Sequence, residues 1–241
     1  MKFFKVSLCI LFIGMLSGSA QNINQFDSEG KRHGIWKKNF EGTDVLRYEG
    51  AFNQGKETGV FKFYKNIDGE PILAAEKVFN DNDSSAYVKF YNGVGKVISE
   101  GKMNGKKYVG TWKYYQNGSQ QLLTVEHYNE QGILHGQRLV YYKNDQIAEE
   151  EHYVNGKLEG VSKWYGENGT LLKTFTYKDD RLHGLSKFYN VKGELVTQGA
   201  YKNGKKDGVW RYYENNELVK EEDFTYKPKY IKVDGKYKKA P

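Results

Sequence analysis

Short runs of alternating apolar and polar residues fill most of this chain, and Gly and Asn residues separate the runs. In residues 209–213, for example, Trp210 and Tyr212 alternate with Val209, Arg211 and Tyr213. A two-residue period bounded by turn formers predicts β-strands, and the turn at Asn215-Asn216 predicts that two such strands form a hairpin. Beyond the first 20 residues no stretch shows a helical period, so the pattern predicts an all-β protein.

The hairpins belong to an internal repeat. A Gly-x-x-x-Gly segment or a variant of it closes each unit, and its last residue serves as an anchor for numbering the unit. The anchors are Gly34, Gly59, Ala86, Gly110, Gly136, Gly160, Gly184 and Gly208, and they recur every 24 to 27 residues. Eight units at a nearly constant step predict an array in which each hairpin buries its apolar side against its neighbours. The Gly anchors are expected to supply positive φ angles at the hairpin junctions.

Aromatic residues keep the register of the anchors. Position +4 after the anchor holds Phe63, Phe90, Tyr114, Trp164, Phe188 and Tyr212, and position +5 holds Tyr64, Tyr91, Tyr115, Tyr165, Tyr189 and Tyr213. The first unit (Trp36) and the fifth (Tyr141, Tyr142) depart from this pattern, which predicts a bulge or a capping irregularity there. Pro71 predicts a break in the second strand of the second unit, because Pro cannot donate to a strand ladder.

Alternation also assigns the two faces of the predicted sheet. Positions +2 and +4 share one side of a strand and carry the more apolar residues, such as Trp112 and Tyr114, so they are expected to form the packed, concave face. Positions +1, +3 and +5 share the wetter side, where a basic residue such as Lys113 lies beside a Tyr such as Tyr115.

Residues 1–20 have the organisation of a signal peptide. Lys2 and Lys5 precede an apolar run, and small residues end at Ala20, where we expect cleavage. A transmembrane anchor is the alternative, but the apolar run is short for a bilayer span. The protein is therefore expected to be exported, with the periplasm, the cell surface and the medium all open as destinations. Cys9, the single cysteine, lies inside this segment, which excludes a disulfide scaffold.

Charge is concentrated at the two ends of the chain. The formal net charge is +7, but residues 227–241 alone hold six Lys and one Asp, and residues 21–226 hold 29 basic and 29 acidic residues. A neutral body argues against a nucleic-acid partner. The basic end is expected to form a last capping hairpin or a solvated tail, and contact with a membrane is not required.

No combination of residues predicts catalysis, a metal or a cofactor. His33, His135 and His183 recur beside anchors, but equivalent positions of neighbouring hairpins lie about 9.6 Å apart, too far for a shared zinc ion. The acidic run Glu149-Glu150-Glu151 is expected to consist of solvated strand positions, because successive residues point to opposite faces. The remaining candidate is the row of tyrosines at position +5, either as binding groups for proteins and sugars or as rings that stabilise strand pairing.

The pattern Gly-x-x-x-Gly-x-aromatic-x-aromatic-Tyr resembles the MORN-repeat variant family, which includes YwqK-type antitoxins. The resemblance covers roughly residues 30–224 and departs from the pattern at Ala86 and in having a signal sequence. It implies an elongated, twisted, open antiparallel sheet of about eight stacked hairpins, a non-enzymatic binding or scaffold role, and no catalytic residue.

These observations predict a signal peptide (residues 1–20), a linker (21–29), the hairpin array (30–226) and a basic end (227–241). The expected function is that of an exported, non-enzymatic scaffold that binds another protein, in the manner of an antitoxin or immunity protein. A cell-envelope glycan binder that uses the Tyr row is the alternative. The outer edges of the first and last hairpins are also expected to allow edge-to-edge self-association.

Overall fold

The computed structural model describes residues 22–80, 83–117, 119–228, 230–233 and 236–239, and the predicted signal peptide lies outside them. These residues form strands throughout and no helix. The first half holds β1 (Gln25–Phe26), β2 (Arg32–Asn39), β3 (Leu46–Asn53), β4 (Lys56–Ile67), β5 (Glu70–Phe79), β6 (Ser85–Tyr91), β7 (Val97–Asn104), β8 (Lys107–Tyr115), β9 (Leu122–Tyr128) and β10 (Gly136–Tyr141). The second half holds β11 (Ile147–Val154), β12 (Lys157–Leu158), β13 (Gly160–Tyr165), β14 (Leu171–Lys178), β15 (Arg181–Leu182), β16 (Gly184–Tyr189), β17 (Leu195–Lys202), β18 (Lys205–Glu214), β19 (Glu217–Asp223), β20 (Tyr230–Val233) and β21 (Lys236–Lys239).

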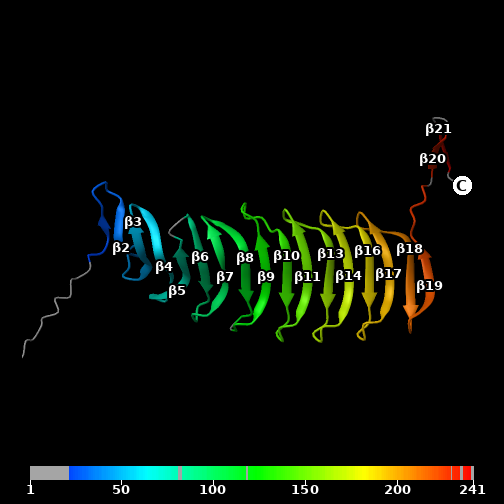
Figure 1. The fold of residues 1–241 in the computed structure, drawn as a ribbon, viewed down its shortest axis with the longest axis horizontal. Helices are drawn as coiled ribbons and strands as arrows, with labels where there is room; N and C mark the ends of the chain where they lie inside the picture. Colours follow the sequence, from blue (N-terminus) through cyan, green and yellow to red (C-terminus); the bar gives the residue numbers. More distant parts are fainter. Residues whose placement is uncertain (1–21, 81–82, 118, 229, 234–235, 240–241) are drawn as a thin grey trace, which may run out of the picture.

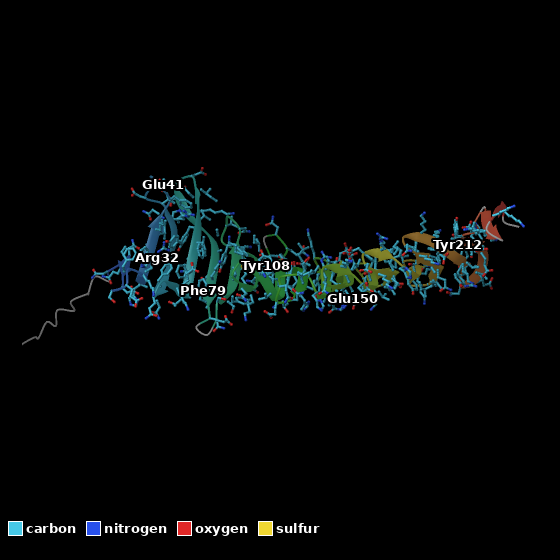
Figure 2. All side chains as sticks on the ribbon, turned by 90° about the horizontal axis from the view of Figure 1, so that it is seen from above. Arg32, Glu41, Phe79, Tyr108, Glu150 and Tyr212 are labelled. Carbon is cyan, nitrogen blue, oxygen red and sulfur yellow. The ribbon has the colours of Figure 1, made fainter. Side chains whose placement is uncertain are left out.

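Strands β1 to β19 form one open antiparallel sheet in which the strands follow one another in chain order. Except at the two ends of the sheet, each hairpin pairs with the one before it and the one after it. The β4–β5 hairpin, for example, pairs with β3 and with β6. Figure 1 shows the resulting single row of strands, and Figure 2 shows side chains projecting from both sides of one layer. The predicted all-β class and the open hairpin array are thus confirmed.

Tight turns at the junctions between hairpins follow the predicted chemistry. Asn155 and Gly156 have φ angles of 51° and 82°, and the anchor Gly208 has a φ of 66°. Positive φ at both central residues is what a twisted two-residue hairpin turn requires, and Asn and Gly adopt it at least cost. Ala86 is the informative exception, because it lies within β6 as an ordinary paired residue and has no positive φ.

Neighbouring junctions are tied to each other by backbone hydrogen bonds. The N–H of Gly156 donates to the carbonyl of Leu134 at 2.8 Å, and the N–H of Gly204 donates to that of Leu182 at 2.8 Å. Each bond joins the turn of one unit to the segment just before the anchor of the preceding unit. The same contact joins Gly55 to Arg32, so several steps of the repeat are linked in an equivalent way, as in a one-dimensional array.

A bulge occurs in every hairpin, and not only in the first and fifth units as the sequence suggested. In the second unit Phe63 pairs with Ala75 but Tyr64 pairs with Leu73, so Ala74 is the extra residue. The first and fifth units have their bulges at the same place, at Lys38/Asn39 and Val140/Tyr141. Both units are therefore in register, and their departure from the aromatic pattern at positions +4 and +5 lies in the side chains and not in the pairing. Bulges increase local twist and bend, and here they are aligned along the sheet.

The prediction of a break at Pro71 is wrong. Strand β5 continues through Pro71, which pairs with Asn66 near the turn. The next strand, β6, pairs only with the part of β5 from Ala75 to Phe79. Pro71 thus lies where no neighbour on that side needs its missing N–H, a position in which strands tolerate Pro.

The two ends of the sheet are closed differently. At the start of the sheet β1, which lies within the predicted linker, pairs with β2 of the array. The centroid of the Phe26 ring lies 5.1 Å from that of the Trp36 ring. At the other end, β20 and β21 pair only with each other in the described residues and stand away from β19 (Figure 1). The basic end therefore contains the expected hairpin, but that hairpin does not cover the edge of the sheet.

The face that carries positions +2 and +4, here called the inner face, is the packed one. At position +2 Phe61, Val88, Trp112 and Trp210 are 0–1% exposed. On the other side, the outer face, the position +1 residues Val60, Val161 and Leu185 are 48–50% exposed. Burial thus confirms the predicted assignment for positions +1 and +2, whereas the rings at +4 and +5 are both half-buried.

Glycines on the return strands make room for these buried rings. A Cβ on Gly101 would lie 2.5–2.7 Å from ring atoms of Trp112, and a Cβ on Gly199 would collide with Trp210. The indole N–H of Trp112 donates to the carbonyl of Lys102 at 2.9 Å, which holds the ring against the neighbouring strand. A single layer of strands buries a Trp completely in this way without a second sheet.

Candidate binding surfaces

A row of mostly charged residues crosses the outer face from one end of the sheet to the other, with opposite charges paired without interruption from β2 to β8. Its members are opposite each other on successive strands, so they lie about 4.8 Å apart. The row is Lys37, Glu49, Lys62, Glu76, Lys89, Glu100, Lys113, Val125, Leu139, Glu150, Lys163, Thr174, Lys187, Gln198, Arg211 and Glu221. The sequence pattern identified the basic residues at position +3 but missed their acidic partners, which lie on the return strands.

Ion pairs form along this row. Lys37 Nζ lies 3.1 Å from Glu49 Oε2, Lys163 Nζ lies 3.1 Å from Glu150 Oε2, and Arg211 Nε lies 2.8 Å from Glu221 Oε1. These side chains are partly exposed, so each pair contributes at most about 1 kcal/mol. The alternation of sign still matters, because like charges directly opposite each other would destabilise the pairing of the strands.

The position +5 tyrosines belong to the same network. The hydroxyl of Tyr64 donates to Glu49 at 2.7 Å, that of Tyr165 donates to Glu150 at 3.1 Å, and that of Tyr115 donates to Glu100. The hydrogen bond from Tyr64 is the largest cause of the lowered pKa of Glu49, followed by the contact with Lys37. Burial, then the contact with Glu49, raises the pKa of Tyr64 to about 12.

Each of these tyrosines also faces an aliphatic residue across its hairpin. Tyr115 pairs with Leu122, Tyr165 with Leu171, and Tyr189 with Leu195. The remaining members of the predicted binding row pair in the same way: Tyr64 with Leu73, Tyr91 with Val97 and Tyr213 with Leu218. The structure therefore places all six candidate tyrosines on the outer face, half-buried, with at least three hydroxyl protons already donated within the chain.

The inner face presents aromatic rings with cations above them. Lys77 Nζ lies 5.5 Å from the ring centroid of Phe63, Lys173 Nζ lies 4.8 Å from that of Trp164, and Lys206 Nζ lies 4.1 Å from that of Trp210. Such cation–π contacts contribute roughly 0.5–1 kcal/mol each at exposed sites. Their recurrence near the beginning, middle and end of the array gives this face apolar surface and positive charge side by side.

A groove of about 870 Å³ lies near the beginning of the array. Phe52, Phe79, Ala86 and Met103 provide apolar walls, and Lys77 lies among the charged residues around it. Several residues of this groove come from the first two units, where the repeat step is 25 and 27 residues. The groove offers room for an apolar side chain of a partner.

In the middle of the array the inner face holds a charge cluster instead of a ring. Arg138 occupies position +2 and contacts Glu126 at 3.2 Å, Glu149 at 3.7 Å and Glu151 at 2.8 Å. Glu151 is buried, with 9% of its surface exposed. The prediction that Glu149, Glu150 and Glu151 are solvated is therefore wrong: Glu149 and Glu151 pair with Arg138 on one face, and Glu150 pairs with Lys163 on the other.

Two histidines, His127 on β9 and His135 beside its anchor, form local hydrogen bonds. His127 Nδ1 lies 2.6 Å from the carbonyl oxygen of Gln137, and His135 Nδ1 accepts the N–H of Asn155 at 3.3 Å. Within the described ranges no group of three or more His, Cys, Asp or Glu side chains is arranged to hold a metal ion. The same residues contain no helix of the length and apolarity that crossing a bilayer demands.

Comparison of this chain with known proteins finds a structural likeness but no match in sequence. No family model matches it, and no curated protein matches it. One solved structure with a detectable likeness is that of a mutant of S. aureus TarM in complex with fondaparinux, α-GlcNAc-glycerol and UDP. The alignment has a TM-score of 0.21 and 11% identity, and it covers 58% of this chain but 19% of that one. A likeness at this level carries no argument about fold or function.

Proposed function

We propose that this chain is an exported, non-enzymatic scaffold that binds another protein along its inner face. The observation that carries the proposal is the single-layer construction of the sheet, in which the inner face of β2–β19 has no second layer over it in the described residues. Faces of this kind are usually covered by another layer of structure, either from the same chain or from a partner.

The chemistry of the inner face favours a polypeptide as its partner. Half-buried rings such as Phe63 and Trp164 offer apolar contact, and Lys77, Lys173 and Lys206 add positive charge beside them. Aromatic side chains are enriched in protein interfaces, and the lysines beside them attract acidic groups of a partner. The partner is accordingly an elongated protein with apolar side chains and acidic groups. The resemblance to MORN-repeat variants supports a binding role and adds neutralisation of a toxin as one form of it.

The glycan alternative depends on the position +5 tyrosines, and their geometry makes it the weaker candidate. The hydroxyls of Tyr64, Tyr115 and Tyr165 already donate to glutamates, so these tyrosines have only rings and lone pairs to offer a sugar. A protein partner on the inner face requires none of these hydroxyls.

Two experiments test the proposal. In the first, the protein captures partners from an envelope extract and cross-links to them are mapped; in the second, the protein is applied to a polysaccharide array. Three proteins are compared: the wild type, a Lys77→Glu/Lys173→Glu/Lys206→Glu variant, and a Tyr115→Phe/Tyr165→Phe/Tyr189→Phe variant. We expect cross-links on the inner face, loss of capture in the Lys variant, and capture retained in the Tyr variant. Binding to a polysaccharide that the Tyr variant loses would support the glycan alternative and overturn the proposal.

Export has its own test. Sequencing of the N-terminus of protein recovered from cells is expected to begin just after Ala20. Recovery of an intact Met1 from protein found only in the cytosol would contradict export without affecting the assignment of the binding face.

A further inference from the structure

Three exposed apolar side chains adjoin one another on the outer face near the beginning of the array. Val60 on β4, Val78 on β5 and Tyr87 on β6 are 48%, 43% and 43% exposed. Val60 pairs directly with Val78, and Val78 pairs directly with Tyr87. They therefore form a continuous apolar stripe across three neighbouring strands, beside the row of alternating charges.

A groove of about 620 Å³ adjoins one end of this stripe. Ile35, Ala51 and Val60 line its apolar part, and Glu49 and Lys62 belong to its charged part. The groove lies where the pairing of β3 and β4 is irregular. Glu49 pairs with Lys62, but Ala51 pairs with Thr58, so β4 has more residues than β3 between these two pairs. The irregularity is thus the origin of a recess in an otherwise regular face.

We propose that this part of the outer face, β3 to β6, is an interface with a second copy of the same chain. The two-fold axis lies between the two facing sheets, runs parallel to the strands and passes midway between β4 and β5. It places β4 opposite the partner's β5 and β3 opposite the partner's β6. Val60 then meets the partner's Val78, and the groove beside Val60 receives the partner's Tyr87. The operation is reciprocal, as a closed dimer requires, so both grooves are filled.

The same axis matches the charges. It places Lys62 opposite the partner's Glu76 and Glu49 opposite the partner's Lys89, and each contact occurs twice. An axis through a strand, instead of between two strands, would place each of these charges opposite its own kind. Because the sign alternates from strand to strand over β2–β8, the charge row disfavours every axis through a strand and allows an axis between two strands. The apolar stripe and the groove then select the axis between β4 and β5.

A second copy suits this surface better than an unrelated partner, because one chain supplies both the groove and the exposed ring that fits it. The proposal leaves the inner face free and does not rest on the proposed scaffold function. Packing of two sheets by their faces, with the strands nearly aligned, is a common arrangement of β proteins.

Sedimentation equilibrium of the purified protein tests the interface. We expect a dimer that dissociates on dilution. Val78→Lys should raise its dissociation constant at least about tenfold, because two lysines then meet apolar surface, and Tyr87→Ala should also weaken it. Val191→Lys is the matched control, because Val191 is 79% exposed in the turn of the seventh hairpin. Circular dichroism and thermal melts check that each variant is folded. If Val78→Lys does not fold, Tyr87→Ala provides the test of the interface.

A monomer at every concentration up to about 1 mM would overturn the proposal. So would a dimer whose dissociation constant is unchanged in a folded Val78→Lys or Tyr87→Ala variant, since it would be formed by another surface such as the exposed edge of β19. Binding of an extended peptide to the groove of a monomeric wild type would likewise replace the second copy as its occupant.

Discussion

The hairpins that start at Gly110 and Gly208 fill the inner face differently from the three hairpins between them. In the outer two, position +2 holds Trp112 or Trp210, and each ring covers a glycine on the preceding strand. In the three between, the same position holds Arg138, Ser162 or Ser186. Backbone pairing and bulges are nevertheless equivalent in all five.

The difference teaches that one backbone tolerates several solutions, provided that neighbouring strands complement each other. Trp112 faces Gly101, so a large residue meets the smallest one. Ser162 instead pairs with Phe175, whose ring is surrounded by those of Trp164 and Phe188 at 5.4 and 5.3 Å. Arg138 is accommodated by carboxylates on both neighbouring strands. Volume and charge are thus balanced between neighbouring strands, both within a hairpin and between adjacent hairpins.

The largest expected effect comes from truncating position +2 in the two kinds of hairpin. Trp112→Ala removes a fully buried ring and should lower the free energy of unfolding by about 3–5 kcal/mol. Ser186→Ala changes the equivalent position, where the buried hydroxyl has no hydrogen-bond partner, and should leave stability unchanged or raise it by up to about 1 kcal/mol. Urea denaturation of both variants measures the contrast. Equal losses would show that the two regions do not differ as described.

A smaller loss is expected from Gly101→Ala. The added Cβ would overlap the ring of Trp112 and should cost about 1–3 kcal/mol, the usual range for overpacking. Gly93→Ala is the matched control, because its Cβ would meet no atom within 4 Å and its φ is not positive. Thermal melts of the two variants suffice for the comparison. An equally destabilised Gly93→Ala would point to backbone conformation instead of the ring as the cause.

The charge cluster should respond to loss of its cation. Arg138→Met leaves Glu126 and Glu151 facing each other without a counter-ion and should destabilise the protein by about 1–3 kcal/mol, less than for a fully buried pair because Arg138 is partly exposed. Adding Glu126→Gln and Glu151→Gln should restore most of the loss. Denaturant titration of the single and triple variants tests this, and a triple variant no more stable than the single one would contradict it.

The smallest expected effect concerns the outer face and depends on pH. The pKa of Glu49 is lowered in the folded protein from its ordinary value of 4.5, chiefly by the hydrogen bond from Tyr64. Its contribution is therefore fully present above that value and is lost as the pH falls through the folded-state pKa. Glu49→Gln should lower the free energy of unfolding by less than about 1 kcal/mol at pH 7 and should leave it unchanged at pH 2.

Denaturation of this variant across that pH range, beside Glu41→Gln in the exposed turn of the first hairpin, measures the difference. The two variants should differ at pH 7 and converge in acid. A difference in unfolding free energy between the two variants that persists at low pH would rule out the carboxylate of Glu49 as its source.

The strands, the eight-fold repeat and the positive φ at anchors such as Gly208 were predictable, because they depend on residues close together in the sequence. The role of Gly101 was not, because only its position beside Trp112, eleven residues on, distinguishes it from a turn glycine. The contacts of Arg138 with Glu126 and Glu151 were not predictable either, because they depend on the register of neighbouring strands. Without that register, a run of acidic residues is typical of a solvated surface.

Sequence alone determined that this protein is an array of hairpins with an apolar and a polar side, because alternation and turn chemistry are local. The tertiary structure decided which residues meet across neighbouring strands. The bulges set that register: they align Glu49 and Glu100 with the lysines on either side of them, direct the Tyr64 and Tyr115 hydroxyls to those glutamates, and open the groove between β3 and β4. A shift of one residue would reverse every face, so these contacts depend on pairing geometry that no single strand contains.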